Sequence, residues 1–97
     1  MKIRFSPRAV DDLGAIADYL SDRSASGALA VEKQIHSTLK LLSEFPRCGR
    51  ILDHRPNVRV IPVTRHPYLL FYSVSGDQNV VLHIRHGARR PVEPGEL

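Results

Sequence analysis

The sequence predicts an α+β fold: a short N-terminal strand, a helix hairpin, and then a three-stranded antiparallel meander. Two observations lead to this. Apolar residues recur at three- and four-residue spacing across the first half, whereas the second half has short β-rich runs separated by turn residues. With 97 residues, the chain fits one domain, 1–97, in which the proline-containing segment 88–97 is expected to be a loose tail.

The first helix is expected to follow a strand over residues 2–5 and to begin at Ser6-Pro7. The Ser6 hydroxyl can accept a hydrogen bond from an exposed backbone N–H, and proline is favoured at the first helical position. An apolar stripe then runs through Val10, Leu13, Ile16, Ala17 and Leu20. Gly14 lowers helix stability by about 1 kcal/mol relative to alanine, so we expect it at a close helix crossing.

The second helix is expected to begin near Ser24 or Ser26 and to end before Pro46. Its apolar stripe is formed by Ala28, Val31, Ile35, Leu39 and Leu42. The polar, arginine-rich segment 47–57 shows no periodicity and is therefore interpreted as a loop. Cys48 is the only cysteine; it excludes an internal disulfide, and we interpret it as an incidental loop thiol.

Three strands are expected over residues 58–64, 68–74 and 80–86, joined by hairpin-length connections. Pro62 cannot donate to a strand ladder, so its strand is expected to be at an edge or bulged there. Alternation places Tyr68, Leu70 and Tyr72 on one face of the middle strand. We expect these rings to pack in the core, because stacking on nucleic-acid bases would require them to be exposed.

Positive charge is concentrated in the second half of the chain. The net charge is +4 and the pI is about 9.7. The charges of residues 1–44 cancel, whereas residues 45–97 carry eight arginines, no lysine and four of the five histidines. Arginine suits phosphate or carboxylate partners, so an anionic partner is expected. No apolar run approaches the roughly 20 residues of a membrane span, which favours a cytoplasmic protein that binds no membrane.

These arginines are expected to form one concave cationic patch. Alternation in the last strand places Leu82 and Ile84 on the core face and His83 and Arg85 on the other. If the helices cover the apolar face, the uncovered face presents Arg85, His83 and Arg59, beside the Arg47/Arg50 loop and the Arg89-Arg90 tail. The alternative interpretation is that the arginines only solubilise an exposed sheet face.

The histidines are expected to hold no metal. His83 and His86 are three residues apart on a strand, so they face opposite sides, and we expect no carboxylate to neighbour them. We therefore predict neither a metal site nor a cofactor. An imidazole could still serve as an acid or a base near neutral pH, although most single histidines in proteins have no catalytic role.

Three stretches in this order resemble the RelE/ParE superfamily of toxin-antitoxin toxins: FSPRAVDDLGAIADYL, LLSEFPRCGR, and PYLLFYSV with VVLHIRHGARRP. The resemblance covers about residues 2–91. It is closest to the ParE branch, which has a Phe-Pro-x-x-Gly turn, a Tyr-x-x-Phe-Tyr strand and a closing His-Gly-x-Arg. The matching residues here are Phe45, Pro46 and Gly49; Tyr68, Phe71 and Tyr72; and His86, Gly87 and Arg89.

The resemblance implies a growth-arresting toxin with the RelE/ParE-like β-α-α-β-β-β fold. Toxins of the RelE branch cut mRNA on the ribosome with a basic cluster and often a C-terminal tyrosine. This chain has no lysine after Lys40 and no tyrosine after Tyr72, so only Arg59, His83, Arg85 and His86 could supply that chemistry. ParE-like toxins instead bind and inhibit DNA gyrase. The absence of the lysines and of the C-terminal tyrosine favours this branch.

Three functions therefore remain open: a gyrase inhibitor, a ribosome-dependent mRNA endoribonuclease, and a non-toxic RNA-binding or structural domain. Both toxin hypotheses imply a ParD-like antitoxin whose acidic C-terminal segment folds onto the groove between helices and sheet. The residues expected to bind the antitoxin or the target are Arg47, Arg50, Arg59, Arg65, Arg85, Arg89 and Arg90.

Overall fold

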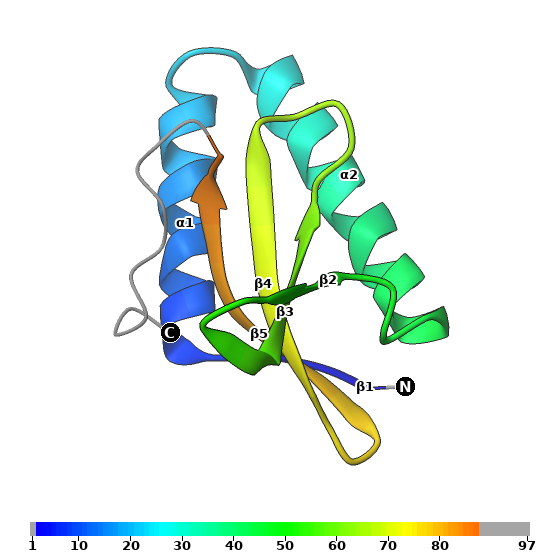
Figure 1. Cartoon of the computed structure of the whole chain (residues 1–97). Coiled ribbons are helices and arrows are strands. Elements are labelled where there is room, and N and C mark those ends of the chain that lie inside the picture. Colours follow the sequence, from blue (N-terminus) through cyan, green and yellow to red (C-terminus); the bar gives the residue numbers. More distant parts are fainter. Residues whose placement is uncertain (1, 88–97) are drawn as a thin grey trace.

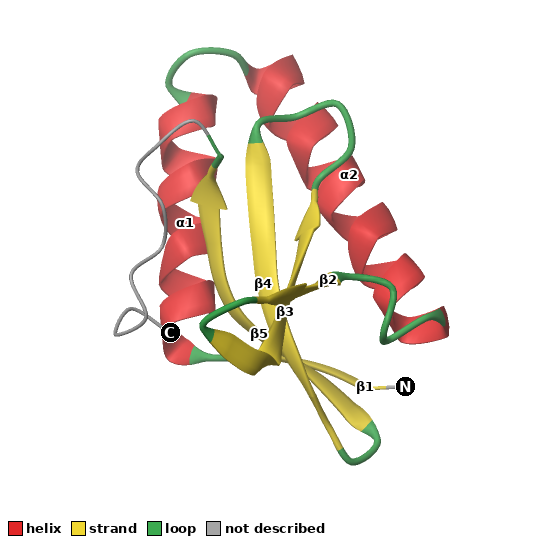
Figure 2. Cartoon of the chain, in the orientation of Figure 1, coloured by secondary structure: helices red, strands yellow, loops and turns green. Residues whose placement is uncertain are grey.

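The computed structural model describes residues 2–87 and contains two helices and five strands within them. In chain order these are β1 (Lys2–Phe5), α1 (Pro7–Ser21), α2 (Ala25–Glu44), β2 (Arg50–Leu52), β3 (Arg55–Pro62), β4 (Tyr68–Ser75) and β5 (Gln78–His86) (Figure 1). The two helices form a hairpin that packs against the sheet (Figure 2). The predicted α+β class is confirmed.

The five strands form one sheet in the order β1-β5-β4-β3-β2. The antiparallel meander of β3, β4 and β5 is as expected. β1 lies parallel to β5, and their pairing ends at Phe5 and Val81. β2 pairs with β3 only as far as Val60, so β3 is an edge strand at Pro62, as the sequence indicated. No helix within residues 2–87 is long and apolar enough to cross a membrane.

Both helices begin at the serines that the sequence indicated. The Ser6 hydroxyl accepts from the N–H of Ala9 at 3.1 Å and donates to the carbonyl of Leu82 at 3.0 Å, which also fixes the start of α1 against β5. Ser24 caps α2 by accepting from the N–H of Gly27 at 3.0 Å. Each cap satisfies a backbone donor that has no partner within the helix.

The end of α2 is attached to the sheet by a buried amide. Asn79 of β5 donates from Nδ2 to the carbonyl of Leu42 at 2.8 Å. Carbonyls in the last turn of a helix lack an intrahelical partner, so this bond satisfies one of them. Asn79 is fully buried, and it fixes the position of the helix end above β5.

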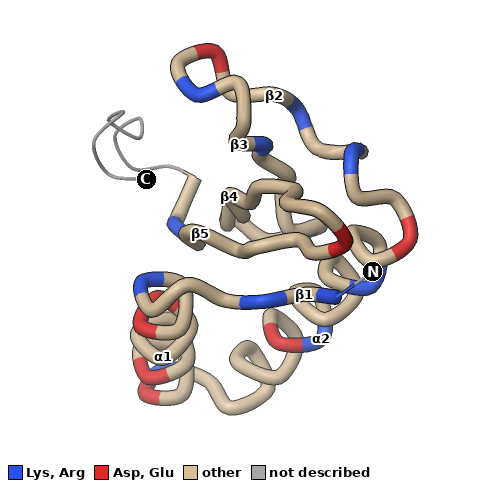
Figure 3. The backbone as a smooth tube through the Cα atoms, turned by 90° about the horizontal axis from the view of Figure 1, so that it is seen from below, with Lys and Arg blue, Asp and Glu red and all other residues tan. Residues whose placement is uncertain are grey.

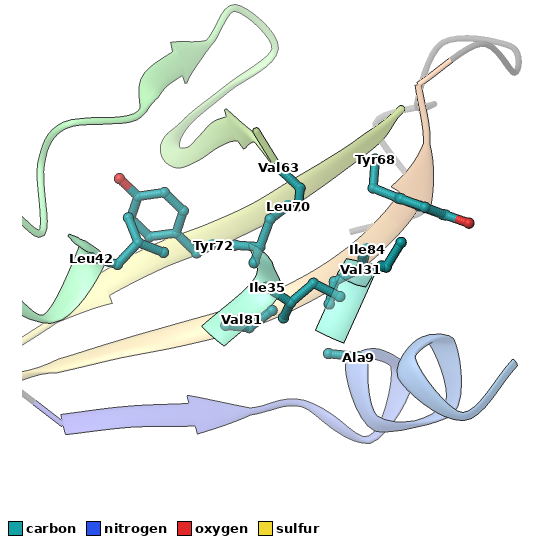
Figure 4. Packing of buried hydrophobic residues seen from close by; sticks show 10 residues of the cluster. All are labelled: Ala9, Val31, Ile35, Leu42, Val63, Tyr68, Leu70, Tyr72, Val81 and Ile84. Atoms are coloured by element: carbon teal, nitrogen blue, oxygen red, sulfur yellow. The ribbon is translucent and has the colours of Figure 1, made fainter. Parts of the chain in front are cut away.

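The main core lies between the helices and the sheet (Figure 4). Its buried members are Ala9, Val31, Ile35, Leu42, Val63, Tyr68, Leu70, Tyr72, Val81 and Ile84. The expectation that Tyr68, Leu70 and Tyr72 pack in the core is confirmed. Val10 was expected in the apolar stripe, but it is 55% exposed because it lies on the outer face of α1.

The interpretation of residues 47–57 as a loop is wrong. Arg50–Leu52 forms β2, and β3 already begins at Arg55. β2 and β3 form the edge of the sheet that lies farthest from β1 and α1 (Figure 3). A second core cluster on the sheet contains buried Val58, Val60 and Phe71, with Leu52, Leu69 and Leu82 packed against them. The face expected to be uncovered is therefore partly buried.

A β-bulge in β5 changes which residues face the helices. Phe71 pairs with His83 and Tyr72 pairs with Val81, so Leu82 is the extra residue between the two pairs. As a result Val81 and Ile84 both lie in the helix-facing core, whereas Leu82 packs in the second cluster. The expectation that Leu82 shares a face with Ile84 is wrong, because it assumed unbroken alternation.

Gly14 does not lie at a helix crossing. A Cβ added to Gly14 would meet no atom within 4 Å, and the residue is exposed on α1. We therefore predict that Gly14→Ala raises the free energy of unfolding by about 1 kcal/mol, because alanine restricts the unfolded chain and favours the helix. Urea unfolding of the two proteins measures this difference; an unchanged or lowered value would contradict it.

Candidate partner-binding site

A groove of about 820 Å³ opens between the helix hairpin and one end of the sheet. It lies at the end where β5 finishes and where the turn between β3 and β4 is located (Figure 1). Its lining consists of Asp12, Ala15, Ile16, Tyr19 and Leu20 of α1, Gly27 and Val31 of α2, His66, Pro67 and Tyr68, and His83, Ile84, Arg85 and His86 of β5.

The two sides of this groove differ in chemistry. The helices contribute mainly small and aliphatic side chains such as Ile16, Leu20 and Val31, whereas three histidines and one arginine come from the sheet side. Tyr19 is 51% exposed, and the guanidinium carbon of Arg23 lies 3.6 Å from the centre of its ring. The groove thus combines apolar surface with a basic wall, which suits a peptide segment with aliphatic and acidic side chains.

Asp12 is the only carboxylate among the described residues that line the groove, and its bonds to His83 and Ile84 both go to β5. Its Oδ2 lies 2.6 Å from Nδ1 of His83 and accepts from the N–H of Ile84 at 3.0 Å. The ring of His83 also stacks on Phe71, with centroids 5.7 Å apart. The expectation that no carboxylate is near His83 is therefore wrong, as is its placement on an exposed face, because only 6% of this residue is exposed.

Asp12 contacts β5 because β1 is short. The pairing of β1 with β5 ends at Val81, so the next backbone groups of β5 have no strand beside them. The Ser6 hydroxyl donates to the Leu82 carbonyl, and Asp12 accepts from the Ile84 N–H. Ser6, the N-cap of α1, and Asp12 within α1 thus replace the missing strand, which protects the open edge of β5. These contacts join residues 72 and 76 positions apart, so no local sequence pattern indicates them.

The Phe-Pro-x-x-Gly turn is held by Tyr72 and Arg59. The Tyr72 hydroxyl accepts from the N–H of Gly49 at 2.9 Å, and the ring is fully buried. The guanidinium of Arg59 donates to the carbonyls of Arg47 and Gly49 at 3.0 and 2.9 Å. Arg59 shares the side of β3 that carries Ile61 and Val63 of the main core. Its expected place on the uncovered face is therefore wrong.

Burial raises the pKa of the Tyr72 hydroxyl above its ordinary value of 10. The folded protein thus holds this proton more tightly than the unfolded chain, so its contribution to stability is present below about pH 10 and is lost as the pH rises through the folded pKa. Tyr72→Phe leaves the Gly49 N–H without its partner and is expected to lower stability by about 1–2 kcal/mol at pH 8.

The difference between the wild type and Tyr72→Phe should shrink above pH 10, since only the wild type must ionise this group on unfolding. Urea unfolding of both proteins between pH 8 and pH 11 measures that difference. A constant difference across this range would contradict the effect of burial on Tyr72.

The remaining predicted arginines come from separate elements. Arg47 is exposed before β2, and Arg50 is exposed in β2 opposite Val60 of β3. Arg65 follows β3, and Arg85 lies on β5. Arg85 is half-buried in the groove wall, and its Nε lies 3.4 Å from the His86 carbonyl. Arg89 and Arg90 lie outside the described residues.

The groove residues that the sequence reasoning missed are Asp12, Tyr19 and His66. The sequence singled out none of the three, because Asp12 and Tyr19 lie within the first helix and His66 lies in the connection between two expected strands. Within residues 2–87, no group of three or more histidine, cysteine, aspartate or glutamate side chains is placed to hold a metal ion.

The fold matches that of toxins from type II toxin-antitoxin systems. The chain aligns with "Toxin RelE2" of Caulobacter vibrioides at 32% identity over 82 residues, which cover 84% of this chain and 90% of the relative. A structure described as the chromosomal ParDE toxin-antitoxin system from P. aeruginosa superposes with a TM-score of 0.73 at 27% identity, covering 89% of this chain and 95% of that one. The isolated E. coli RelE toxin has the same fold, with a TM-score of 0.66 at 20% identity over 92% of this chain and 86% of that one.

The family is defined by a match over nearly the whole chain. Residues 3–91 match the family described as "ParE toxin of type II toxin-antitoxin system, parDE". The chain therefore belongs to the ParE toxin family, and the resemblance seen in the sequence is confirmed. A toxin of such a system has a cognate antitoxin.

Proposed function

We propose that this toxin arrests growth by binding DNA gyrase and inhibiting it, without a chemical reaction of its own. The chain lacks the lysines and the C-terminal tyrosine of the RelE nucleases, and only Arg59, His83, Arg85 and His86 could replace them. The main support comes from the contacts of two of these residues. The side chain of Arg59 is bonded to the carbonyls of Arg47 and Gly49, and His83 is buried against Asp12. Cleavage of RNA needs an accessible base, an acid and cations near the phosphate. A binding inhibitor needs none of these, and the family match points to ParE toxins.

Induction of the toxin without an antitoxin tests the gyrase proposal. The expected result is growth arrest with double-strand breaks and a DNA-damage response, while cellular mRNA remains intact. Arrested cells with intact chromosomes would contradict gyrase as the target. A strain that grows normally, at an expression level verified by immunoblotting, would contradict a toxic function altogether.

A ribosome-dependent endoribonuclease is the second candidate, supported by the Asp12–His83 pair. A carboxylate on Nδ1 orients an imidazole and leaves Nε2 for proton transfer, and Arg85 and His86 line the same groove. This candidate predicts cuts at codon boundaries in translated messages. Substituting His83 or Arg85 should abolish those cuts, and an uncut transcriptome in arrested cells would exclude it.

For the antitoxin, the proposal is that an acidic segment folds into the groove beside α1. The groove has apolar surface for aliphatic side chains and a basic wall for carboxylates. Long-range attraction between these charges would accelerate docking at low salt. If the antitoxin and gyrase bind overlapping surfaces of the toxin, they would then compete for it.

A further inference from the structure

The turn between β3 and β4 contains a residue in an unfavourable backbone conformation. The N–H of His66 bonds to the carbonyl of Val63 at 3.2 Å and closes a four-residue turn, in which Arg65 is the third residue. Arg65 has φ 68°, and it is the only residue other than glycine with positive φ within residues 2–87. A turn with positive φ at the third position normally has glycine or asparagine there.

No stabilising interaction within the described part of the chain explains an arginine at this position. Arg65 is exposed, and its guanidinium has no hydrogen-bond or ion-pair partner among residues 2–87. Its Cβ opposes the left-handed conformation, whereas glycine would adopt it without strain. Strained residues that persist in this way are concentrated at functional sites, so this conformation points to a contact outside the chain.

The position of the turn shows where this contact would be made. His66 and Pro67 of the same turn line the groove, and the carbonyl of Pro67 accepts from the N–H of Gly87 at 2.5 Å. The turn is therefore fastened to the end of β5, where Arg85 is located. Arg65 directly precedes His66 and Pro67, at the end of the groove that Arg85 also lines.

The chemistry of the groove favours a protein segment as its occupant. Among the described residues that line the groove, the one carboxylate is Asp12, which is bonded to His83 and accepts from the Ile84 N–H. Single-stranded nucleic acid binds on exposed aromatic rings, but Tyr68 of the groove is buried and Arg23 covers one face of the exposed Tyr19 ring. Aliphatic surface next to Arg85 and the nearby Arg65 instead fits a peptide that carries both aliphatic and acidic residues.

We propose that Arg65 is kept in its strained turn because its guanidinium binds a carboxylate of the antitoxin segment in the groove. This inference rests on the proposal that the antitoxin occupies the groove, but it does not depend on the target of the toxin. A carboxylate bonded to a guanidinium forms one of the stronger hydrogen-bonded contacts in proteins. Arg65 would thus favour complex formation while it disfavours folding of the free toxin.

Substitution of Arg65 separates these two effects. Arg65→Gly should raise the melting temperature of the free toxin by about 4 °C, and Arg65→Asn should raise it by about half as much, because both residues accept positive φ. Calorimetry with the purified antitoxin encoded beside the toxin gene should show affinity weakened about tenfold for both variants. Arg65→Lys should retain most of the affinity, since it keeps the charge.

Lys33→Gln is the matched control, because Lys33 is an exposed cation on α2 outside the groove. It should leave antitoxin affinity unchanged. The inference is overturned if Arg65→Gly raises the melting temperature while affinity stays the same, or if it lowers the melting temperature. Loss of growth arrest with unchanged antitoxin affinity would assign the guanidinium to the target and also overturn it. Failure of the toxin to inhibit gyrase would contradict only the proposed target.

Discussion

Gly49→Ala is expected to lower the free energy of unfolding by about 3 kcal/mol. An alanine Cβ at this position would lie 2.6 Å from the Tyr72 hydroxyl oxygen and 2.8 Å from Cε1 of its ring, closer than real Cβ contacts come. The buried ring must move, and its hydrogen bond to the Gly49 N–H is lost with it. Overpacking and the lost bond together account for this size of effect.

Thermal unfolding measures the Gly49 effect as a fall of more than 10 °C in melting temperature. Gly14→Ala is the matched control, since the same substitution at an open helical position should stabilise the protein. The double variant Gly49→Ala/Tyr72→Phe should lose less than the sum of the two single losses, because both remove the same hydrogen bond. Additive losses, or a Gly49→Ala protein as stable as the wild type, would contradict this role of the turn.

Asp12→Ala is expected to lower the free energy of unfolding by about 2–3 kcal/mol. The substitution leaves the N–H of Ile84 unpaired at the open edge of β5 and removes the carboxylate from His83. Hydrogen bonds to a charged group contribute more than neutral ones, and a buried donor without a partner is unfavourable. Asp12→Asn keeps one acceptor oxygen, so its loss should be smaller.

Asp11→Ala provides the control for the Asp12 effect, because Asp11 is exposed on the same turn of α1. Its stability should remain within about 0.5 kcal/mol of the wild type. Urea unfolding compares the three variants, and amide hydrogen exchange should show faster exchange at Ile84 in Asp12→Ala. Equal stability of the Asp11 and Asp12 variants would show that α1 does not hold the edge of β5.

The sequence predicted those features that depend on local chemistry. Ser6 and Ser24 cap their helices as expected, because a capping serine acts on a backbone N–H only three residues away. The burial of Tyr68, Leu70 and Tyr72 followed from simple alternation along an unbroken strand. The order of helices and strands followed from periodicity and turn residues for the same reason.

Features that depend on distant contacts could not be predicted in this way. The bulge at Leu82 breaks the alternation of side chains along β5, so that Val81 and Ile84 lie on the same face. Nothing in the local pattern of apolar residues indicates this bulge. β2 has only three residues, too few to show alternation, and it is defined by its pairing with β3. The sequence pattern placed Arg59 and His83 on a cationic surface. In the fold, Arg59 donates to the Gly49 carbonyl and His83 is bonded to Asp12, which is distant in the sequence.

The most direct test of the proposed target uses purified DNA gyrase and purified toxin. With relaxed plasmid, ATP and gyrase, a stoichiometric amount of toxin should block supercoiling and increase the amount of linear plasmid. Prior addition of the antitoxin should prevent both effects. Normal supercoiling at a large excess of folded toxin, together with cleavage of mRNA on translating ribosomes, would contradict the gyrase proposal and favour the nuclease.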